Sequence, residues 1–325
     1  MSDGPTFAER IRQRFPEGLT GVLVVGGTRT TYVLERNRHR DDPGHIEDFQ
    51  DYAQFLVSRY FELISMYYDL GGQNLIIPAF SYQGFSDRGP EYARQAMRAC
   101  LLMASEQFQA FYREQGIDPY FVGIDTLLHL PPDDEKHRLG EQFEAFHAQW
   151  NYQAGRRKLI WEIAPIPLFS FWQAHTIMGE AAHSSLDESL KHTDDLQAMH
   201  DQLYSYYARA AYGTDIPMPH FYLGSNRNGD LKLHAMLPIS LLCGGAFRVY
   251  YTPYPTLFMT RETLQTILED LAFGKPLRST RTDYGGQLTP ELAEAEYQRI
   301  LELRADPAST VGLTRQITGE GSPQP

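Results

Sequence analysis

The chain has 325 residues, of which 42% are hydrophobic, so we expect a folded protein with a sizeable core. Its 29 lysines and arginines against 41 aspartates and glutamates give a net charge of −12, which argues against general nucleic-acid binding. No apolar run approaches the ~18 residues of a membrane span. The two cysteines, Cys100 and Cys243, lie far apart in the sequence, and residues 1–15 lack the apolar core of a signal peptide, which together favour a reduced, cytoplasmic protein.

Short apolar runs bounded by glycine and polar residues predict buried strands. The first covers residues 21–25 and ends in the turn Gly26–Gly27–Thr28–Arg29. Five more strands follow, at 75–80, 120–124 with a continuation to 130 left open, 158–163, 220–223 and 247–252.

Apolar residues three and four positions apart predict helices between these strands. The expected helices cover residues 8–15, 46–70, 90–115, about 133–152, 166–212, 261–273 and 290–303, with loops at 36–44 and 81–89. Alternating strands and helices predict an α/β fold with a central, mostly parallel six-stranded sheet surrounded by helices. We expect a helical extension over 1–18, one domain over 19–310 and a flexible tail over 311–325.

The turn after the first strand is a candidate binding site. Glycines at the carboxyl edge of a strand let the backbone approach a ligand closely, and ligands bind at that edge of open α/β sheets. Thr28 offers a hydroxyl and Arg29 a fork of donors that suits a phosphate. The alternative is an ordinary turn with a surface arginine. The sequence has no GxxxxGK[ST] loop, no GxGxxG after the first strand and no GxSxG, which excludes the best-known nucleotide and hydrolase motifs.

Two other groups of polar residues suggest simpler interpretations. The histidine pairs in residues 175–200 are eight apart, which does not match the four-residue spacing of metal ligands on one helix face. A dense cationic cluster follows the first turn: Arg36, Arg38, His39 and Arg40. It is either a solvated charged loop or a lid that reaches over an anion.

Four segments, in order, resemble the cis-prenyltransferase-like family and its diterpene-processing branch. GGTRTTYVLE (26–35) resembles DGTRRWFHLE, and IPAFSYQGFSDRGPEYARQAM (77–97) resembles PIFS…DRGxRYxxQAL. FYREQGIDPYFVGIDTLLHLP (111–131) and YYTPYPTLFMTRETLQTILED (250–270) are similar to two further family segments. The match covers about 21–123 and 221–313, and is weak over 133–215.

The resemblance implies a parallel sheet of about six strands with surrounding helices. It implies an allylic prenyl diphosphate as substrate, a bicyclic C20 compound in this branch, which ionises to a carbocation. Water then captures the cation to give a diterpene alcohol, or the group passes to a nucleoside such as adenosine. It also implies Mg²⁺ as cofactor and a homodimer. From the charge and the length of the apolar runs we expect no nucleic-acid partner and no integral membrane segment.

The resemblance also assigns residues. It implies catalytic roles for Arg29, Tyr52 and Tyr92. It implies that substrate is bound by Gly26, Gly27, Thr28, Ser81, Arg88 and Arg227. Arginines would stabilise the departing diphosphate, and aromatic rings the cation.

One departure from the family pattern concerns the metal. The family's aspartate, which holds Mg²⁺ or assists ionisation, is replaced by Gly26, and the second arginine of the motif by Thr30. Glu35 lies several residues further on. Three explanations are open. Another acid holds the metal, such as Asp87, Asp48 or Asp51; or the cations of residues 36–40 drive ionisation; or the protein is a catalytically silent isoprenoid-binding or partner subunit.

Overall fold

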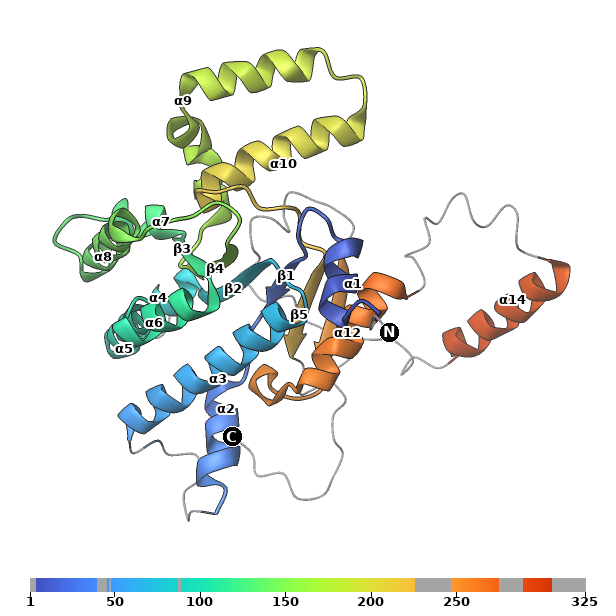
Figure 1. Cartoon of the computed structure of the whole chain (residues 1–325), viewed down its shortest axis with the longest axis horizontal. Coiled ribbons are helices and arrows are strands. Elements are labelled where there is room, and N and C mark those ends of the chain that lie inside the picture. Colours follow the sequence, from blue (N-terminus) through green and yellow to red (C-terminus); the bar gives the residue numbers. More distant parts are fainter. Residues whose placement is uncertain are drawn as a thin grey trace.

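The computed structural model describes residues 4–39, 46, 48–86, 89–225, 247–274 and 289–305. Within these residues six strands form one parallel sheet in the order β3-β4-β2-β1-β5-β6 (Figure 1). The strands are β1 (Thr20–Leu23), β2 (Asn74–Phe80), β3 (Ile117–Val122), β4 (Arg157–Ile163), β5 (Phe221–Ser225) and β6 (Arg248–Thr252). The predicted α/β fold and all six predicted strands are confirmed.

The central residues of β1, β2 and β4 are mostly apolar because helices cover both faces of the sheet. In β2, Leu75 and Ile77 face one hydrophobic cluster, and Ile76 between them faces the other. Trp161 and Ile160 of β4 divide in the same way, and all five residues are fully buried. A strand buried on both faces needs a continuous apolar run rather than an alternating one. This is why the sequence signal for the strands is strong.

Helices fill the described connections between the strands. They are α1 (Phe7–Arg14), α2 (Thr28–Tyr32), the π-helix η1 (Val33–Asn37), α3 (Phe49–Asp69), α4 (Tyr82–Ser86), α5 (Pro90–Leu102), α6 (Glu106–Gln115), α7 (Ile124–Leu128), α8 (Glu135–Gln149), α9 (Pro167–Lys191), α10 (Leu196–Tyr212), the 3₁₀-helix η2 (Thr256–Phe258), α12 (Arg261–Phe273) and α14 (Pro290–Ala305). Side-chain oxygens of Asp48, Asp134 and Thr260 accept hydrogen bonds from the first backbone N–H groups of α3, α8 and α12. Such caps satisfy N–H groups that have no partner within the helix.

Some predicted boundaries are wrong. The single helix expected over 90–115 is two helices, because α5 ends at Leu102 and the Ser105 hydroxyl caps α6 by accepting from the N–H of Phe108. The third strand does not continue to 130, because Gly123 takes a left-handed conformation (φ 82°) and α7 follows. The expected turn at 26–29 and loops at 36–44 and 81–89 also contain helix: α2 starts at Thr28, η1 ends at Asn37 and α4 begins at Tyr82.

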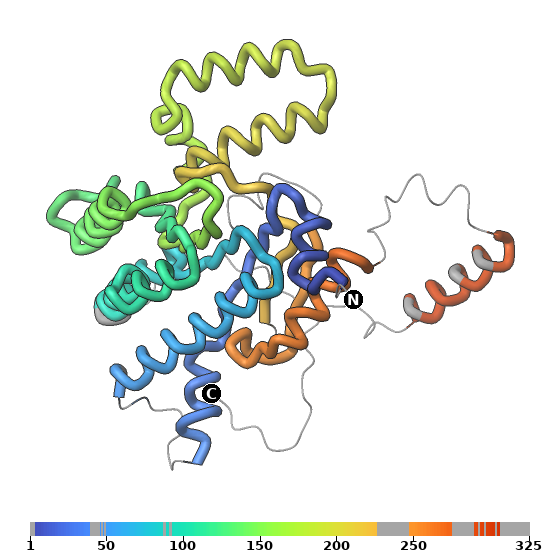
Figure 2. The backbone as a smooth tube through the Cα atoms, in the orientation of Figure 1, coloured from blue at the N-terminus to red at the C-terminus, as the bar shows by residue number. Residues whose placement is uncertain are grey.

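Helix α1 packs beside α12, although the two are far apart in the sequence (Figure 2). Ile11 of α1 is fully buried in the larger core cluster. The Arg14 side chain donates a hydrogen bond to the carbonyl of Ala272 (3.1 Å), and the Arg10 guanidinium lies 5.0 Å from the ring centre of Phe273. Residues 7–14 are thus attached to the body of the domain by both apolar and polar contacts.

Helices α9 and α10 form a pair that projects from the sheet (Figure 1). The inner part of α10 packs on the sheet through Tyr204 and Tyr212. On another side of the same turns of α10, Tyr206 and Ala210 form a small separate cluster with Ala174 of α9. Gly179 interrupts α9 with a left-handed φ of 79°, a conformation that glycine adopts without strain. Of the helices in the described part of the chain, none has the length and apolar character required to cross a membrane.

The imidazole of His147 is a buried hydrogen-bond acceptor, which makes folding sensitive to acid. Its Nε2 atom accepts from the backbone N–H of Phe121 (2.9 Å), and burial lowers the pKa of His147 from 6.5 to about 4. The unfolded chain binds a proton below pH 6.5 that the folded chain does not bind until about pH 4. We therefore expect stability to be complete above pH 6.5 and to fall by about 2–3 kcal/mol as the pH drops to 4.

Denaturant unfolding at a series of pH values measures this effect. His147→Gln keeps an acceptor for Phe121 but does not titrate, so the loss of stability between pH 6.5 and 4 should be smaller in this variant. His192→Gln is the matched control, because the side chain of His192 is 77% exposed. An unchanged pH dependence in His147→Gln would contradict the assignment.

Candidate active site

The carboxyl ends of all six strands lie at one edge of the sheet. At this edge, the order of the strands changes direction beside β1. The chain after β1 runs through α2 and α3 into β2, whereas β5, on the other side of β1, pairs with β6. In open parallel sheets, ligands bind in the crevice where the strand order reverses. The topology therefore places the candidate site at the ends of β1 and β5.

The turn between β1 and α2 is held by the segment that follows β6. The hydroxyl of Thr256 is fully buried and donates to the carbonyl of Val24 (2.9 Å). It also accepts from the N–H of Gly26 (3.4 Å), and the Thr256 N–H donates to the Gly26 carbonyl (3.3 Å). Gly27 follows with a φ of 74°, and a Cβ there would lie 3.0 Å from the Cβ of Pro255. The backbone of the turn is thus fixed before any ligand binds.

The structure brings two of the predicted site residues together. The hydroxyl of Thr28, at the start of α2, lies 3.2 Å from the hydroxyl of Tyr52 on α3. The ring of Tyr52 packs edge-on against Tyr32, with ring centres 5.1 Å apart. The Tyr32 hydroxyl in turn donates to the carboxylate of Asp51 (2.7 Å). Thr28 and Tyr52 therefore form one polar pair beside the turn, supported by an aromatic neighbour.

The other predicted residues differ in how the structure places them. Arg29 is exposed on α2, next to Thr28. Ser81 lies directly after β2, and its hydroxyl accepts from the N–H of Gly84 (3.1 Å), so it caps the start of α4. Tyr92 lies in the first turn of α5, but its side chain is outside the described part of the structure. Arg88 and Arg227 lie outside the described residues, as do Asp87 and residues 40–45.

The cationic cluster, so far as it is described, belongs to the end of η1. The Arg36 guanidinium lies 5.9 Å from the ring centre of Phe55. Arg38 donates to the carbonyl of Leu34 (3.0 Å) and to the imidazole of His39 (2.9 Å). Arg36, Arg38 and His39 are exposed. These cations lie one to three turns beyond the Gly26–Arg29 turn on the same continuous helical segment.

The acids near the turn already have partners. Glu35 forms an ion pair with Arg59, which also pairs with Glu62 (2.7 Å). The carboxylate of Asp48 accepts from the N–H groups of Gln50 (2.8 Å) and Asp51 (3.0 Å). Among the described residues there is no group of three or more His, Cys, Asp or Glu side chains that could hold a metal ion. The acids described at this edge therefore offer no ready-made metal cage, and a Mg²⁺ here would need oxygens of the substrate diphosphate as ligands.

Position 26 lies against the end of β5. A Cβ built on Gly26 would lie 2.6 Å from the hydroxyl oxygen of Ser225. A side chain at position 26 thus has room only if the Ser225 hydroxyl rotates away or Ser225 is replaced by a smaller residue. The sequence did not indicate Ser225 or Thr256 as site residues; the one available signal was the similarity of residues 250–270, which include Thr256.

A further acid at the same edge is separate from this turn. Asp125 is in the first turn of α7, after β3, which β4 and β2 separate from β1. Burial raises the pKa of the Asp125 carboxyl, and hydrogen bonds from the backbone N–H of Thr126 and from Ser170 partly offset this. Asp125 was also not indicated by the sequence.

No family model matches the chain. The structure is similar to the crystal structure of lavandulyl diphosphate synthase from Lavandula x intermedia in complex with dimethylallyl diphosphate, with a TM-score of 0.52 and 15% identity over 79% of this chain and 95% of that one. The chain thus has the cis-prenyltransferase fold. In sequence, it is 24% identical to tuberculosinyl adenosine transferase of Mycobacterium tuberculosis (strain CDC 1551 / Oshkosh) over 289 residues, which is 88% of this chain and 84% of the relative. The resemblance to the cis-prenyltransferase-like diterpene synthase family is confirmed.

The contact between positions 26 and 225 makes a prediction for stability. Gly26→Ala should lower the free energy of unfolding by about 1 kcal/mol, because the new methyl group forces the Ser225 hydroxyl out of its rotamer. Ser225→Gly in the same chain should restore most of the loss. Denaturant unfolding measures both variants, with Gly4→Ala as control, because a Cβ at Gly4 has no neighbour within 4 Å. Equal losses in the single and double variants would be inconsistent with this contact.

Proposed function

We propose that this chain is an enzyme that acts on a prenyl diphosphate. Two comparisons support the proposal: the relative in sequence is named a transferase of a tuberculosinyl group, and the structural relative is a prenyl diphosphate synthase. The observation that carries it to this chain is the 3.2 Å contact between Thr28 and Tyr52. Thr28 belongs to the candidate phosphate-binding turn and Tyr52 to a different helix, so the contact joins a polar site to an aromatic one.

The finer proposal is that the substrate is a bicyclic C20 prenyl diphosphate. The bond between the allylic carbon and oxygen breaks, and the electron pair leaves with the diphosphate. Arg29 and the hydroxyl of Thr28 bind the diphosphate and stabilise the charge that develops on it. The ring of Tyr52, which Tyr32 supports from behind, faces the allylic cation, which the negative face of an aromatic ring stabilises. Water adds to the cation, and its proton passes to the diphosphate or to solvent, which gives a diterpene alcohol.

The remaining expectations belong to the same proposal. Tyr92, Ser81, Arg88 and Arg227 are proposed to complete the site, and Mg²⁺ is proposed to accompany the diphosphate if Asp87 supplies a ligand. We also propose that the protein is a cytoplasmic homodimer, which light scattering on the purified chain tests. A nucleoside acceptor in place of water is tested by adding adenosine to the assay.

The activity is tested by product analysis with mass spectrometry. Purified protein is mixed with linear and bicyclic C20 diphosphates, each with Mg²⁺ or with a chelator. We expect a diterpene alcohol above the level of spontaneous hydrolysis. Arg29→Gln should lower the rate of product formation about 100-fold, in the range found for the loss of one charge-stabilising donor. Arg138→Gln is the control, because Arg138 is exposed on α8, in the connection between β3 and β4 rather than beside β1. If no substrate gives product, the chain is the catalytically silent relative.

Tyr52 has a second, separable effect. Tyr52→Phe keeps the ring that faces the cation but removes the hydroxyl that contacts Thr28. We expect kcat to fall by about tenfold while the melting temperature changes little, because the hydroxyl positions the polar groups rather than the core. Tyr52→Leu removes the ring as well and should lower kcat further. Equal kcat values for the Phe and Leu variants would exclude a role for the ring.

A further inference from the structure

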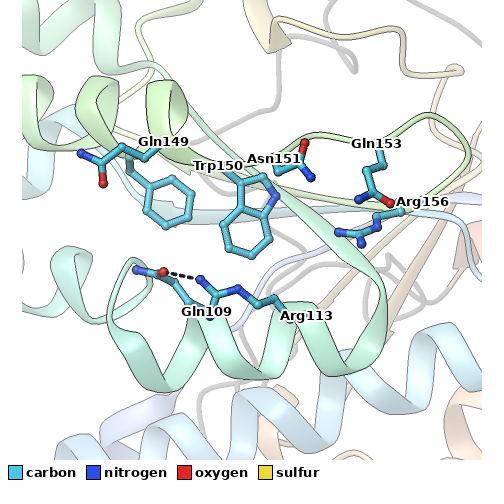
Figure 3. A pocket seen from close by; sticks show the side chains of 8 residues that line it. Gln109, Arg113, Gln149, Trp150, Asn151, Gln153 and Arg156 are labelled. Atoms are coloured by element: carbon cyan, nitrogen blue, oxygen red, sulfur yellow. Dashed lines mark hydrogen bonds between the residues drawn. The ribbon is translucent and has the colours of Figure 1, made fainter.

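A cavity of about 330 Å³ lies at the edge of the sheet opposite the candidate active site (Figure 3). It is bounded by the end of α6, the end of α8 and the segment that leads into β4, so it is next to the amino ends of β3 and β4. Sites for small molecules begin at about this size. Its lining consists of two guanidinium groups, two aromatic rings and four amide side chains.

One wall of the cavity is the indole of Trp150, which is fixed on several sides. Its Nε1 donates to a carboxylate oxygen of Asp118 (3.0 Å). The ring of Phe146 stacks on it, with ring centres 5.5 Å apart and planes 13° apart, and Tyr112 packs edge-on at 6.0 Å. An aromatic wall that is already ordered costs a ligand little conformational entropy on binding.

The carboxylate of Asp118 fixes the position of this wall. Its side chain is only 2% exposed. Besides Trp150, it accepts from the backbone N–H of Gln153 (2.9 Å) and lies 3.6 Å from the guanidinium of Arg156. A buried carboxylate is stable only when it is hydrogen-bonded and paired, and Asp118 is both. The buried carboxylate of Asp118 thus connects Trp150, Gln153 and Arg156 to β3.

The cavity carries a net positive charge on an acidic protein. Arg113 enters it from α6, 5.4 Å from the ring centre of Trp150, and donates to the side-chain oxygen of Gln109 (3.0 Å) (Figure 3). Arg156 enters from the other side. Asp118 balances one of these two guanidinium groups, and every other lining side chain is uncharged. A local excess of positive charge in a chain of net charge −12 points to an anionic ligand.

We propose that this cavity binds a phosphate monoester of a planar heterocycle, of the size of a nucleoside monophosphate. A phosphate presents three terminal oxygens and can be shared by two guanidinium groups, whereas a carboxylate is matched by one. The planar part of the ligand lies along the Trp150 wall. The amides of Gln149, Asn151 and Gln153 offer both donors and acceptors, which the edge of a heterocycle requires. The proposal does not depend on the function of the opposite edge.

Titration calorimetry on the full-length protein tests the proposal, with AMP as probe and adenosine as its uncharged counterpart. We expect AMP to bind and adenosine to bind at least tenfold more weakly. Arg113→Gln should weaken AMP binding at least tenfold. This arginine is exposed and contacts an amide and a ring rather than a carboxylate, so the variant should fold; its melting temperature verifies this. Arg156→Lys keeps a charge beside Asp118 but loses the fork, and should weaken binding as well.

Two matched variants localise the binding. Arg138→Gln on α8 and Arg29→Gln at the opposite edge should bind AMP as the unmodified protein does. The proposal is overturned if AMP does not bind at millimolar concentration, or if adenosine binds equally well. It is also overturned if Arg29→Gln abolishes AMP binding while Arg113→Gln retains it, because AMP would then occupy the other edge of the sheet.

Discussion

All six strands run in the same direction, and this constraint decides where everything else can lie. Each strand must be followed by a connection that returns to the other edge, so helices cover both faces and no strand can alternate between apolar and polar residues. Tyr67 on α3 illustrates how tightly the returning helices are held. Its hydroxyl is buried within hydrogen-bond distance of the carbonyl oxygens of Leu19 (2.9 Å) and Asn74 (2.8 Å). Leu19 directly precedes β1, and Asn74 is the first residue of β2. The carboxyl edge of the sheet is formed by turns, and the polar residues of the candidate active site lie in and beside these turns.

Those turns depend on contacts between segments that are distant in the sequence. Thr256 holds the backbone at Val24 and Gly26 from 230 residues away, and Ser225 lies against the same glycine. The acids nearby serve the architecture: Asp48 caps a helix, Asp51 accepts from Tyr32, and Glu35 pairs with Arg59. A site built in this way offers hydroxyls, rings and cations to a ligand, rather than a cluster of carboxylates.

Much of the fold follows from the sequence because the signals are local. The apolar runs at 21–25 and 75–80 predict buried strands from their own residues alone, without information from the rest of the chain. In the same way, Thr260 forms the cap and Arg261–Phe273 the helix that the sequence predicts. The break at Met103–Ser105 was missed because no glycine or proline marks it, and a serine cap can equally lie inside a longer helix. Of the site, Thr28 was indicated by the turn after the first strand and Tyr52 by resemblance only, and their contact was predicted by neither. Thr256, Ser225 and the cavity around Trp150 required the tertiary structure, since no local pattern specifies a contact across two hundred residues.

The paired helices α9 and α10 differ from the rest of the molecule in how they are stabilised. Ala174, Tyr206 and Ala210 pack against one another between the two helices, whereas Tyr204 and Tyr212 of α10 and Phe171 of α9 pack on the sheet. Residues that pack only within this pair of helices do not affect how the strands of the sheet are aligned with one another. Insertions, deletions and substitutions there should accumulate during evolution faster than in the strands, since selection for the sheet does not act on them. Related chains can therefore differ most in the length and composition of this projection while keeping the edge geometry that the turns at β1 and β5 require.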